Sequence, residues 1–492
     1  MKYKNILKNR YRAIFKYTGT IILILSFVLL LPLLSLFHNP SEINFVDEFL
    51  LAFFLALITG TILYFILGKS SEAITLRLKE GGIIVVFSWI LAIIISSLPF
   101  YLGMNMSLTN SIFESVSGWT TTGLTVVNEA ETPSIFLLWR SIMQFFGGAG
   151  LAVIALSSIL PMQGMGLYLA EGREDKLLPN VKNSTKIIMR IYFGYTFMGA
   201  ILYKIAGMNL FDSANHSMAA LSTGGFSTKP GSIGHWDNLA IYLITILLMF
   251  LGTINFATHF VLLRGKIKKF IKNAEIKLMF FLLIIFTPLV AFLSRTNIDF
   301  SFMDIIKNEV FQLVSALSTT GYSTVGMGKI SLILFFVIIL FMLIGGGTGA
   351  TAGGIKQYRV FIILKSIYWE IKEQFQGNYQ VKENCIYKGE ERLYIKDEDI
   401  KKIANYIILY LSTYFLGVLI FISKGYSIKN SMFEFGSALG TVGLSVGLTG
   451  ANAPSVILWT EIFGMILGRL EFFIIIFAII KIIKDQKYML LN

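Results

Sequence analysis

Residues 317–324 read Leu-Ser-Thr-Thr-Gly-Tyr-Ser-Thr, a polar stretch broken by glycine that stands between two long apolar runs. The pattern occurs four times along the chain. The copies are Ser-Gly-Trp-Thr-Thr-Thr-Gly-Leu at 117–124, Ala-Leu-Ser-Thr-Gly-Gly-Phe-Ser at 220–227, Ala-Leu-Ser-Thr-Thr-Gly-Tyr-Ser at 316–323 and Ala-Leu-Gly-Thr-Val-Gly-Leu-Ser at 438–445. Small residues are frequent at helix interfaces, but four copies in corresponding places indicate an internal repeat.

The apolar runs around these copies indicate a membrane protein. Of the 492 residues, 55% are hydrophobic and 14% are charged, whereas a soluble domain has about 25% charged residues. A helix needs about 20 apolar residues to cross a bilayer. Suitable runs lie at 17–37, 48–68, 82–102, 135–160, 187–207, 239–263, 276–294, 331–364, 403–423 and 455–483.

Each polar copy lies between two of these runs and follows a segment too short to cross the membrane. The short segments are 108–119, 212–222, 303–318 and 429–440. A half-length helix followed by an extended return accounts for this order, and irregular backbone at membrane depth must be buried in protein or line a water-filled path. We therefore predict an all-α integral membrane protein with two N-terminal helices and four fused helix–pore-loop–helix repeats around a pseudo-fourfold pore. The predicted domains are two leading helices at 1–70 and four repeats at 71–175, 176–270, 271–395 and 396–492.

Converging loops of this composition can bind a cation. Backbone carbonyl oxygens can replace the water around K⁺, glycine permits a positive φ and leaves no Cβ in the path, and the half-helices would point their negative C-terminal ends at the ion. The predicted K⁺ filter residues are Thr121, Thr122, Gly123, Thr223, Gly224, Gly225, Thr319, Thr320, Gly321, Thr441, Val442 and Gly443.

A glycine-rich decamer interrupts the apolar run that follows the third copy. Glycine costs about 1 kcal/mol relative to alanine in a helix, so this segment is predicted to be an intramembrane loop and a movable gate below the filter. A close-packed helix seam of small residues is the alternative, and a phosphate-binding loop is disfavoured because the Gly-Lys-[Ser/Thr] ending is absent. The predicted gate residues are Gly345, Gly346, Gly347, Thr348, Gly349, Ala350, Thr351, Ala352, Gly353, Gly354 and Lys356, together with Arg469.

Arg469 lies within the last apolar run, far from the basic end at Lys481. An intramembrane charge is a functional candidate, and here it could form a barrier to cations; a structural ion pair is the alternative. Glu471 is two positions away and is expected on a different helix face. Arg140, Lys204 and Glu461 lie nearer the outer ends and are expected to snorkel or to form pairs.

The distribution of Lys and Arg predicts the orientation. The basic groups of the N-terminus, of the loops near Lys69, Lys186, Lys268 and Lys365 and of the C-terminus all fall on one side, which the positive-inside rule assigns to the cytoplasm. The formal charge of +13 therefore reflects topology, and we expect no nucleic-acid partner. The other side is more acidic and would concentrate cations.

No pattern indicates an enzyme or a resident cofactor. The segment Gly443-Leu-Ser-Val-Gly447 matches a nucleophile elbow in letters, but that motif requires an α/β sheet. The four histidines lack metal-ligand spacing, and the single cysteine, Cys385, excludes a disulfide framework within the chain. The only ion predicted is K⁺ itself, held at the filter.

At these residues the chain resembles the Trk/Ktr/HKT superfamily of K⁺ transporters over nearly its whole length. The most specific stretches are Phe113-Glu-Ser-Val-Ser-Gly-Trp-Thr-Thr-Thr-Gly123, Ile344-Gly-Gly-Gly347 continuing to Gly353-Gly-Ile-Lys356, and Gly468-Arg-Leu-Glu471. The two leading spans make it more similar to TrkH-type subunits than to the shorter KtrB type.

The resemblance implies a homodimer with one pore per subunit and a cytosolic TrkA-like regulatory subunit that binds NAD or ATP. It also implies that the glycine loop and Arg469 form the gate. Glycine at all four filter positions goes with K⁺ preference in that family. The fourth loop differs most from the other three, because Gly440 and Val442 stand on either side of Thr441.

We therefore expect a multi-pass protein of the cell (inner) membrane, with both termini in the cytoplasm, that takes up K⁺ through the filter. A symporter that couples K⁺ to Na⁺ or H⁺ is the alternative, although the repeats read as parallel and mid-span carboxylates are scarce apart from Glu471.

Overall fold

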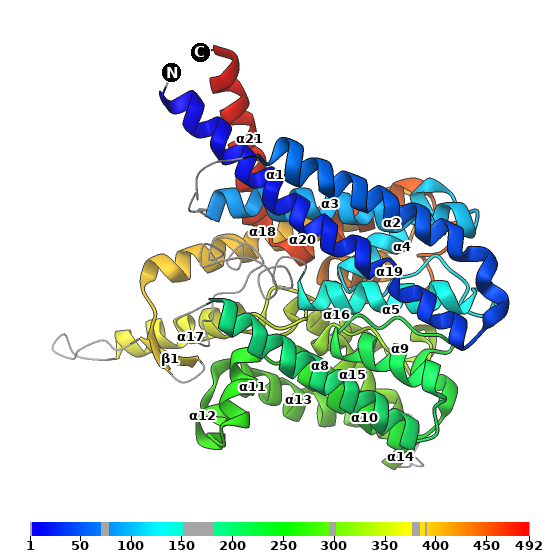
Figure 1. Ribbon diagram of the computed structural model, residues 1–492. Helices are drawn as coiled ribbons and strands as arrows, with labels where there is room; N and C mark the ends of the chain where they lie inside the picture. The colour runs from blue at the N-terminus through cyan, green and yellow to red at the C-terminus, as the bar shows by residue number, and fades with distance from the viewer. Residues whose placement is uncertain are drawn as a thin grey trace.

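The computed structural model describes residues 2–69, 78–150, 181–294, 302–375, 384–388 and 391–491, and these are almost entirely helical (Figure 1). The expectation of an all-α membrane protein is confirmed by the helical content and the exposed apolar side chains. By length and composition, five helical segments within the described ranges could each cross a membrane, and one bent pair would be a sixth.

Two long helices precede the repeats. They are α1 (Lys2–Val28) and α2 (Val46–Thr61), joined by η1 (Leu31–Phe37) and η2 (Pro40–Phe45), and α2 continues into the π-helical turn η3 (Ile62–Leu67). Gly60 allows the two helices to pack closely, because a Cβ there would lie 2.8 Å from Leu23 Cγ. The outer side of α2 exposes Phe54 and Ile58, as expected for a surface that faces lipid.

Four units follow, each a long helix, a short helix, a loop and a second helix. The first unit is α3 (Leu78–Gly103), α4 (Leu108–Trp119) and α5 (Ser134–Ala149), and the second is α8 (Val181–Ile205), α9 (Leu210–Leu221) and α10 (Leu239–Thr253). In the third unit the long helix is α13 (Ala274–Leu293), the short helix is made of α14 (Phe302–Ile305), η5 (Ile306–Val310) and α15 (Phe311–Ser318), and the second helix is α16 (Leu332–Ile344). The fourth unit is α18 (Asp397–Ser423), α19 (Ile428–Gly440) and α20 (Ser455–Leu470).

Side-chain caps start three of the short helices. Ser107, Asn209 and Ser427 each accept a hydrogen bond from a backbone N–H in the first turn of α4, α9 and α19. Such a cap satisfies a donor that the helix itself cannot. Two small 3-10 helices, η4 (Ser232–Trp236) and η6 (Met327–Lys329), lie in the segments that lead from the loops to the second helices.

The second helix of every unit stops part-way along the apolar run. Helix α5 ends at Gly150, α16 ends at Gly345, and α20 ends at Glu471, all with positive φ. Helix α10 is followed by α11 (Phe256–Leu263) at an angle of 108°. The continuous spans expected at 239–263, 331–364 and 455–483 are therefore broken, and residues 151–160 of the expected span 135–160 lie outside the described residues.

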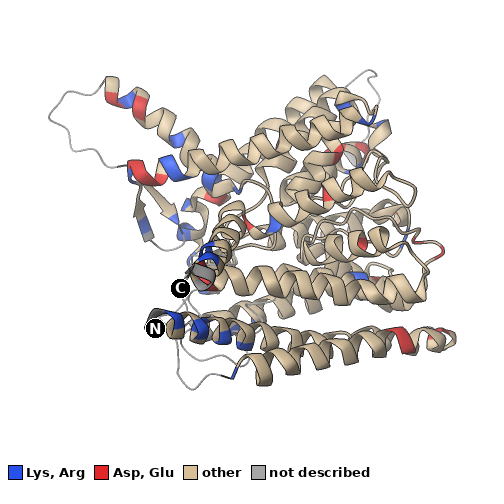
Figure 2. Ribbon diagram, turned by 90° about the horizontal axis from the view of Figure 1, so that it is seen from above, with Lys and Arg blue, Asp and Glu red and all other residues tan. Residues whose placement is uncertain are grey.

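The remaining elements gather at one end of the molecule. They are α12 (Ile267–Lys272), α17 (Gln357–Gln374), the antiparallel strands β1 (Cys385–Lys388) and β2 (Glu391–Tyr394), and α21 (Phe472–Leu491). Figure 2 shows most Lys and Arg near this end, beside both termini and the hairpin. The two chain ends lie side by side (Figure 1), where the Tyr11 hydroxyl donates to Asp485 Oδ2 at 3.2 Å. We call this end the basic face.

Candidate functional site

The four short helices end in the same unusual backbone conformation. Thr121, Thr223, Thr319 and Thr441 have φ values of 56°, 53°, 55° and 51°. A β-branched residue is a rare occupant of this left-handed region. Each threonine N–H is held by a carbonyl of the preceding helix, Gly118, Ala220, Ala316 and Ala438, all at 3.1 Å. The helix end therefore imposes the strained conformation on the loop.

The four Thr-x-Gly loops close a ring. A Cβ built on Gly123 would clash with the carbonyl oxygen of Gly224, and one on Gly225 would clash with that of Thr320. In the same way a Cβ on Gly321 would clash with the carbonyl oxygen of Val442, and one on Gly443 would clash with that of Thr122. Each loop is thus in direct backbone contact with the next, and the fourth is in contact with the first. The structure brings together all twelve residues that the sequence predicts as the filter.

Serine side chains brace three of the loops. Ser117 Oγ and Ser437 Oγ accept from the N–H groups of Gly123 and Gly443 at 3.1 and 3.0 Å, and Ser315 Oγ donates to Tyr322 O at 2.7 Å. The second loop has Ala219 at this place. There Gln144 of α5 donates from Nε2 to Gly224 O at 2.6 Å and accepts from Phe226 N at 3.1 Å. Sequence reasoning missed Gln144, because its role depends on the neighbouring unit.

The loop threonines differ in their side-chain partners. Thr223 Oγ1 donates to Ser222 O at 2.7 Å, and Thr319 Oγ1 accepts from Gly353 N at 2.9 Å. Thr121 Oγ1 and Thr441 Oγ1 are buried and have no hydrogen-bond partner among the described residues. These two hydroxyl oxygens can therefore serve as ligands for an ion.

A buried ion pair supports the first loop from behind. Glu114 of α4 accepts from Arg140 Nε of α5 at 2.7 Å and from Val126 N at 3.0 Å, and the side chains are 0% and 1% exposed. Arg140 also donates to Ser227 O of the second unit at 3.3 Å. Arg140 was expected either to snorkel or to form a pair. The structure shows a pair, with Glu114 on the adjacent short helix.

The glycine loop, residues 345–354, is not helical and packs against the Thr-x-Gly loops. Its backbone bonds to the end of α10 through Gly347 N to Thr253 O at 3.0 Å and Thr351 N to Gly252 O at 3.3 Å. Thr351 Oγ1 lies 3.1 Å from Thr223 Oγ1. Glu275 of α13 accepts from Thr348 N and Oγ1 at 2.7 and 2.6 Å. The alternative of a close-packed helix seam is therefore wrong for this segment.

Arg469 joins the glycine loop to the first unit. Its guanidinium donates to Thr351 O, to Gly147 O at 2.6 Å and to Gly148 O at 3.2 Å. These three acceptors are backbone carbonyl oxygens. Glu471 lies just beyond the last residue of α20, so it occupies no face of that helix, and it pairs with Arg359 of α17 at 2.7 Å. Lys356, two residues after the glycine loop, donates from Nζ to Ala352 O.

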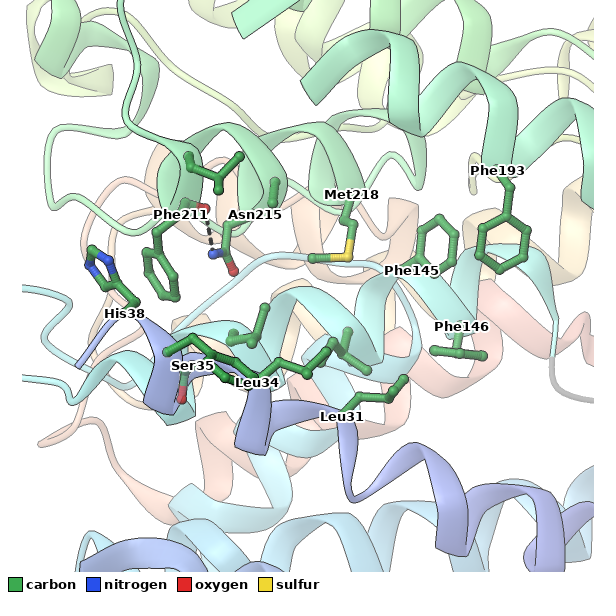
Figure 3. A pocket seen from close by; sticks show the side chains of 15 residues that line it. Leu31, Leu34, Ser35, His38, Phe145, Phe146, Phe193, Phe211, Asn215 and Met218 are labelled. Carbon is green, nitrogen blue, oxygen red and sulfur yellow. Dashed lines mark hydrogen bonds between the residues drawn. The ribbon is translucent and has the colours of Figure 1, made fainter. Parts of the chain in front are cut away.

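An apolar groove lies apart from these loops. Its volume is about 480 Å³, and it runs between η1, α5 and the helices α8 and α9. Figure 3 shows Leu31, Phe145 and Met218 lining it, with His38 stacked on Phe211 at one end. A lining of this kind offers few ligands to a hydrated cation, so the Thr-x-Gly ring is the stronger candidate site.

Comparisons with known proteins agree over nearly the whole chain. The family model TrkH, described as a cation transport protein, matches residues 46–490. The chain is 31% identical over 471 residues to the uncharacterized cation transporter MJ1485 of Methanocaldococcus jannaschii, with 94% of each chain covered. It is 30% identical over 488 residues to the Trk system potassium uptake protein TrkH of Escherichia coli K12, covering 94% of this chain and 97% of that protein.

A solved structure is also similar. The crystal structure of the potassium transporter TrkH from Vibrio parahaemolyticus superposes with a TM-score of 0.80 at 26% identity, covering 96% of this chain and 98% of that chain. These proteins are transporters and not enzymes. On the extent of the family match, this chain belongs to the TrkH family of cation transport proteins.

Proposed function

We propose that this chain takes up K⁺ through a selectivity filter formed by its four Thr-x-Gly loops. The observation that carries the proposal is the closed ring of backbone contacts from Gly123 through Gly225 and Gly321 to Gly443. Four short helices direct their C-terminal ends, which carry partial negative charge, toward this ring. The names of the relatives in Escherichia coli and Vibrio parahaemolyticus support K⁺ as the ion.

The filter consists of Thr121, Thr122, Gly123, Thr223, Gly224, Gly225, Thr319, Thr320, Gly321, Thr441, Val442 and Gly443. Their carbonyl and hydroxyl oxygens replace water around the ion. Gly123, Gly225, Gly321 and Gly443 are required because a Cβ at each of these four would displace a carbonyl of the neighbouring loop. The domain boundaries that group the loops into four repeats, at 71–175, 176–270, 271–395 and 396–492, are part of this proposal.

The gate is the glycine loop with Arg469. In the structure the loop contacts Thr223 and Thr319, so an ion leaving the filter on this side meets it first. Arg469 anchors the loop through Thr351 O and adds a fixed positive charge. A movement that separates Arg469 from Thr351 would free the loop and remove the barrier together.

The basic face lies in the cytoplasm in this proposal, and both termini with it. With the inside negative, each 100 mV supplies about 2.3 kcal/mol per unit charge, so inward K⁺ movement needs no chemistry from this subunit. We propose a homodimer in the cell membrane whose basic face binds a cytosolic subunit that senses NAD or ATP. The phrase Trk system in the relatives' names supports such a multi-subunit assembly.

The purified protein in proteoliposomes tests the proposal. ⁸⁶Rb⁺ uptake driven by a membrane potential alone is expected, without a Na⁺ or H⁺ gradient. Uptake that depends strictly on one of these gradients would favour the coupled symporter. Absence of ⁸⁶Rb⁺ uptake under every gradient, with and without Arg469→Ala to release the gate, would contradict the K⁺ filter.

A further inference from the structure

The fourth unit replaces the buried arginine of the first unit by a carboxyl group. Glu114 and Glu434 stand at the same distance before Thr121 and Thr441. Helices α5 and α20 both begin after a proline, and Arg140 and Glu461 occupy the same position within them. Glu114 thus faces a permanent cation, whereas Glu434 faces a second acid.

Glu434 has the environment of an ionised carboxylate. It accepts from Ser445 Oγ at 2.6 Å, from Val446 N at 2.8 Å and from Thr449 N at 2.9 Å. Glu434 and Glu461 are both 0% exposed. The second oxygen of Glu461, Oε2, is buried without a hydrogen-bond partner among the described residues. An ionised oxygen left in this way would be far more costly than a neutral carbonyl oxygen.

A count of protons shows that this cluster lacks one. Thr449 Oγ1 lies 2.6 Å from Glu434 Oε1 and 2.7 Å from Glu461 Oε1. Two hydrogen bonds join these three oxygens, but the threonine hydroxyl has a single proton. The second proton must come from one of the two acids. Since Glu434 already accepts from three other donors, the acid that keeps its proton is Glu461.

We propose that Glu461 binds a proton that donates to Thr449 Oγ1, while Thr449 donates to Glu434, and that this proton replaces the charge that Arg140 supplies in the first unit. The link connects α20 with residues 445–449, directly after the fourth Thr-x-Gly loop. Loss of the proton leaves two carboxylates on one hydroxyl and loosens that segment. If the chain conducts K⁺ as proposed above, its flux falls as the proton is lost.

The groups around Glu461 are few. Helix α20 packs against α19, α4, α18 and α21. Glu434 is the charged group that acts on Glu461. Among the other charged residues of these elements, Lys429 lies over the Phe335 ring and Glu114 is paired with Arg140. Arg469 lies at the far end of α20. The remaining ones are in the first turns of α18 and on α21, at Asp397, Glu398, Asp399, Lys401, Lys402, Lys481, Lys484, Asp485 and Lys487.

Infrared spectroscopy of the full-length protein in lipid tests the proton directly. The wild type is expected to show the carbonyl stretch of a protonated carboxylic acid at neutral pH. Glu461→Gln should lose this band, and Glu131→Gln, which alters an exposed acid, should retain it. Thr449→Val should shift the band, because the acid loses its acceptor. A spectrum in which Glu461→Gln and the wild type have the same protonated-acid band would overturn the proposal.

⁸⁶Rb⁺ flux against pH tests the consequence. Glu461→Gln keeps a donor for Thr449 at every pH, so its flux should lose the alkaline decrease that the wild type shows. A variant that keeps the wild-type pH profile would contradict the regulatory role of the proton. The infrared result decides the proton assignment independently of whether the protein conducts K⁺, so failure of the proposed function is recognised separately.

Discussion

The loop threonines combine a strained backbone with a fixed direction for their carbonyl groups. A residue in the left-handed region costs of order 1–3 kcal/mol and persists only where its surroundings impose it. Here the imposing contacts are the backbone bonds from Thr121 to Gly118 and their equivalents in the other loops. The repeated conformation indicates that the direction of the oxygens, and not local stability, determines the sequence of these loops.

Gly123→Ser is expected to reduce the preference for K⁺ over Na⁺. Gly123 has a φ of 89°, and its Cβ would clash with Gly224 O. The left-handed backbone alone costs about 1–2 kcal/mol for a residue with a Cβ, which corresponds to roughly a tenfold change in an equilibrium. Reversal potentials in planar bilayers measure the permeability ratio. Gly328→Ser, where no atom lies within 4 Å of the new Cβ, is the control; equal ratios in both variants would argue against the filter assignment.

Arg469→Ala is expected to raise K⁺ flux. The change removes the donor to Thr351 O and to Gly147 O, and a hydrogen bond to a charged group contributes about 1.5–3 kcal/mol. Loss of one such bond shifts the gate roughly tenfold or more toward the open state. Arg469→Lys, which keeps the charge but not the forked geometry, should lie between the two. Unchanged flux in Arg469→Ala would exclude Arg469 from the gate.

Arg140→Leu is expected to destabilise the protein by about 3–5 kcal/mol, because it leaves Glu114 buried without its partner. Thermal unfolding in detergent, followed by the fluorescence of the buried Trp119 and Trp139, measures the change. The double variant Glu114→Gln with Arg140→Leu should recover much of the loss. If the single variant unfolds at the wild-type temperature, the pair does not support the first loop.

At the scale of elements, the repeat could be predicted from the sequence because four polar copies interrupt apolar runs at corresponding places. The breaks in the second helices could be anticipated only in part. The glycines of 345–354 predict one break, but α20 ends at Glu471, a residue that does not favour a positive φ. Its pairing with Arg359 of α17 is a tertiary contact that local sequence cannot reveal.

The support behind the loops was also missed. Gln144 supports the loop of the next unit, 80 residues away in the chain. Glu461 was expected to snorkel or to pair, but its link through Thr449 to Glu434 was not anticipated. A position-by-position comparison of the repeats could have revealed Arg140 and Glu461 as equivalents. It could not have revealed that Thr449 lies between the two acids, because that follows from the return path of the loop.

The seating of the glycine loop is tested by Gly353→Ala. A Cβ at Gly353 would clash with Thr441 Oγ1 and lie 2.5 Å from Gly440 O, so the loop cannot remain against the fourth Thr-x-Gly loop. Flux without any partner protein is expected to rise, because the barrier is displaced. Gly450→Ala, which meets no atom within 4 Å, is the matched control. If flux falls, or rises no more than in the Gly450→Ala control, the loop does not obstruct the path.

At the scale of the molecule, the distribution of charge predicts which face is cytoplasmic. The basic face carries both termini and the hairpin (Figure 2), and α18 follows the hairpin along the chain. With 27 residues, α18 extends about 40 Å, enough to separate the two faces by a bilayer.

The single cysteine allows this orientation to be measured on the native chain. Cys385 lies on β1 at the basic face and is partly exposed, so a charged maleimide that cannot cross the bilayer should label it in inside-out vesicles and not in right-side-out vesicles. Cys385→Ser combined with Ala451→Cys, at an exposed position before α20, should give the opposite pattern. Labelling of Cys385 in right-side-out vesicles would instead place the basic face outside. Because the membrane potential drives cations toward the negative side, the proposed gate would then be the entrance of the pore.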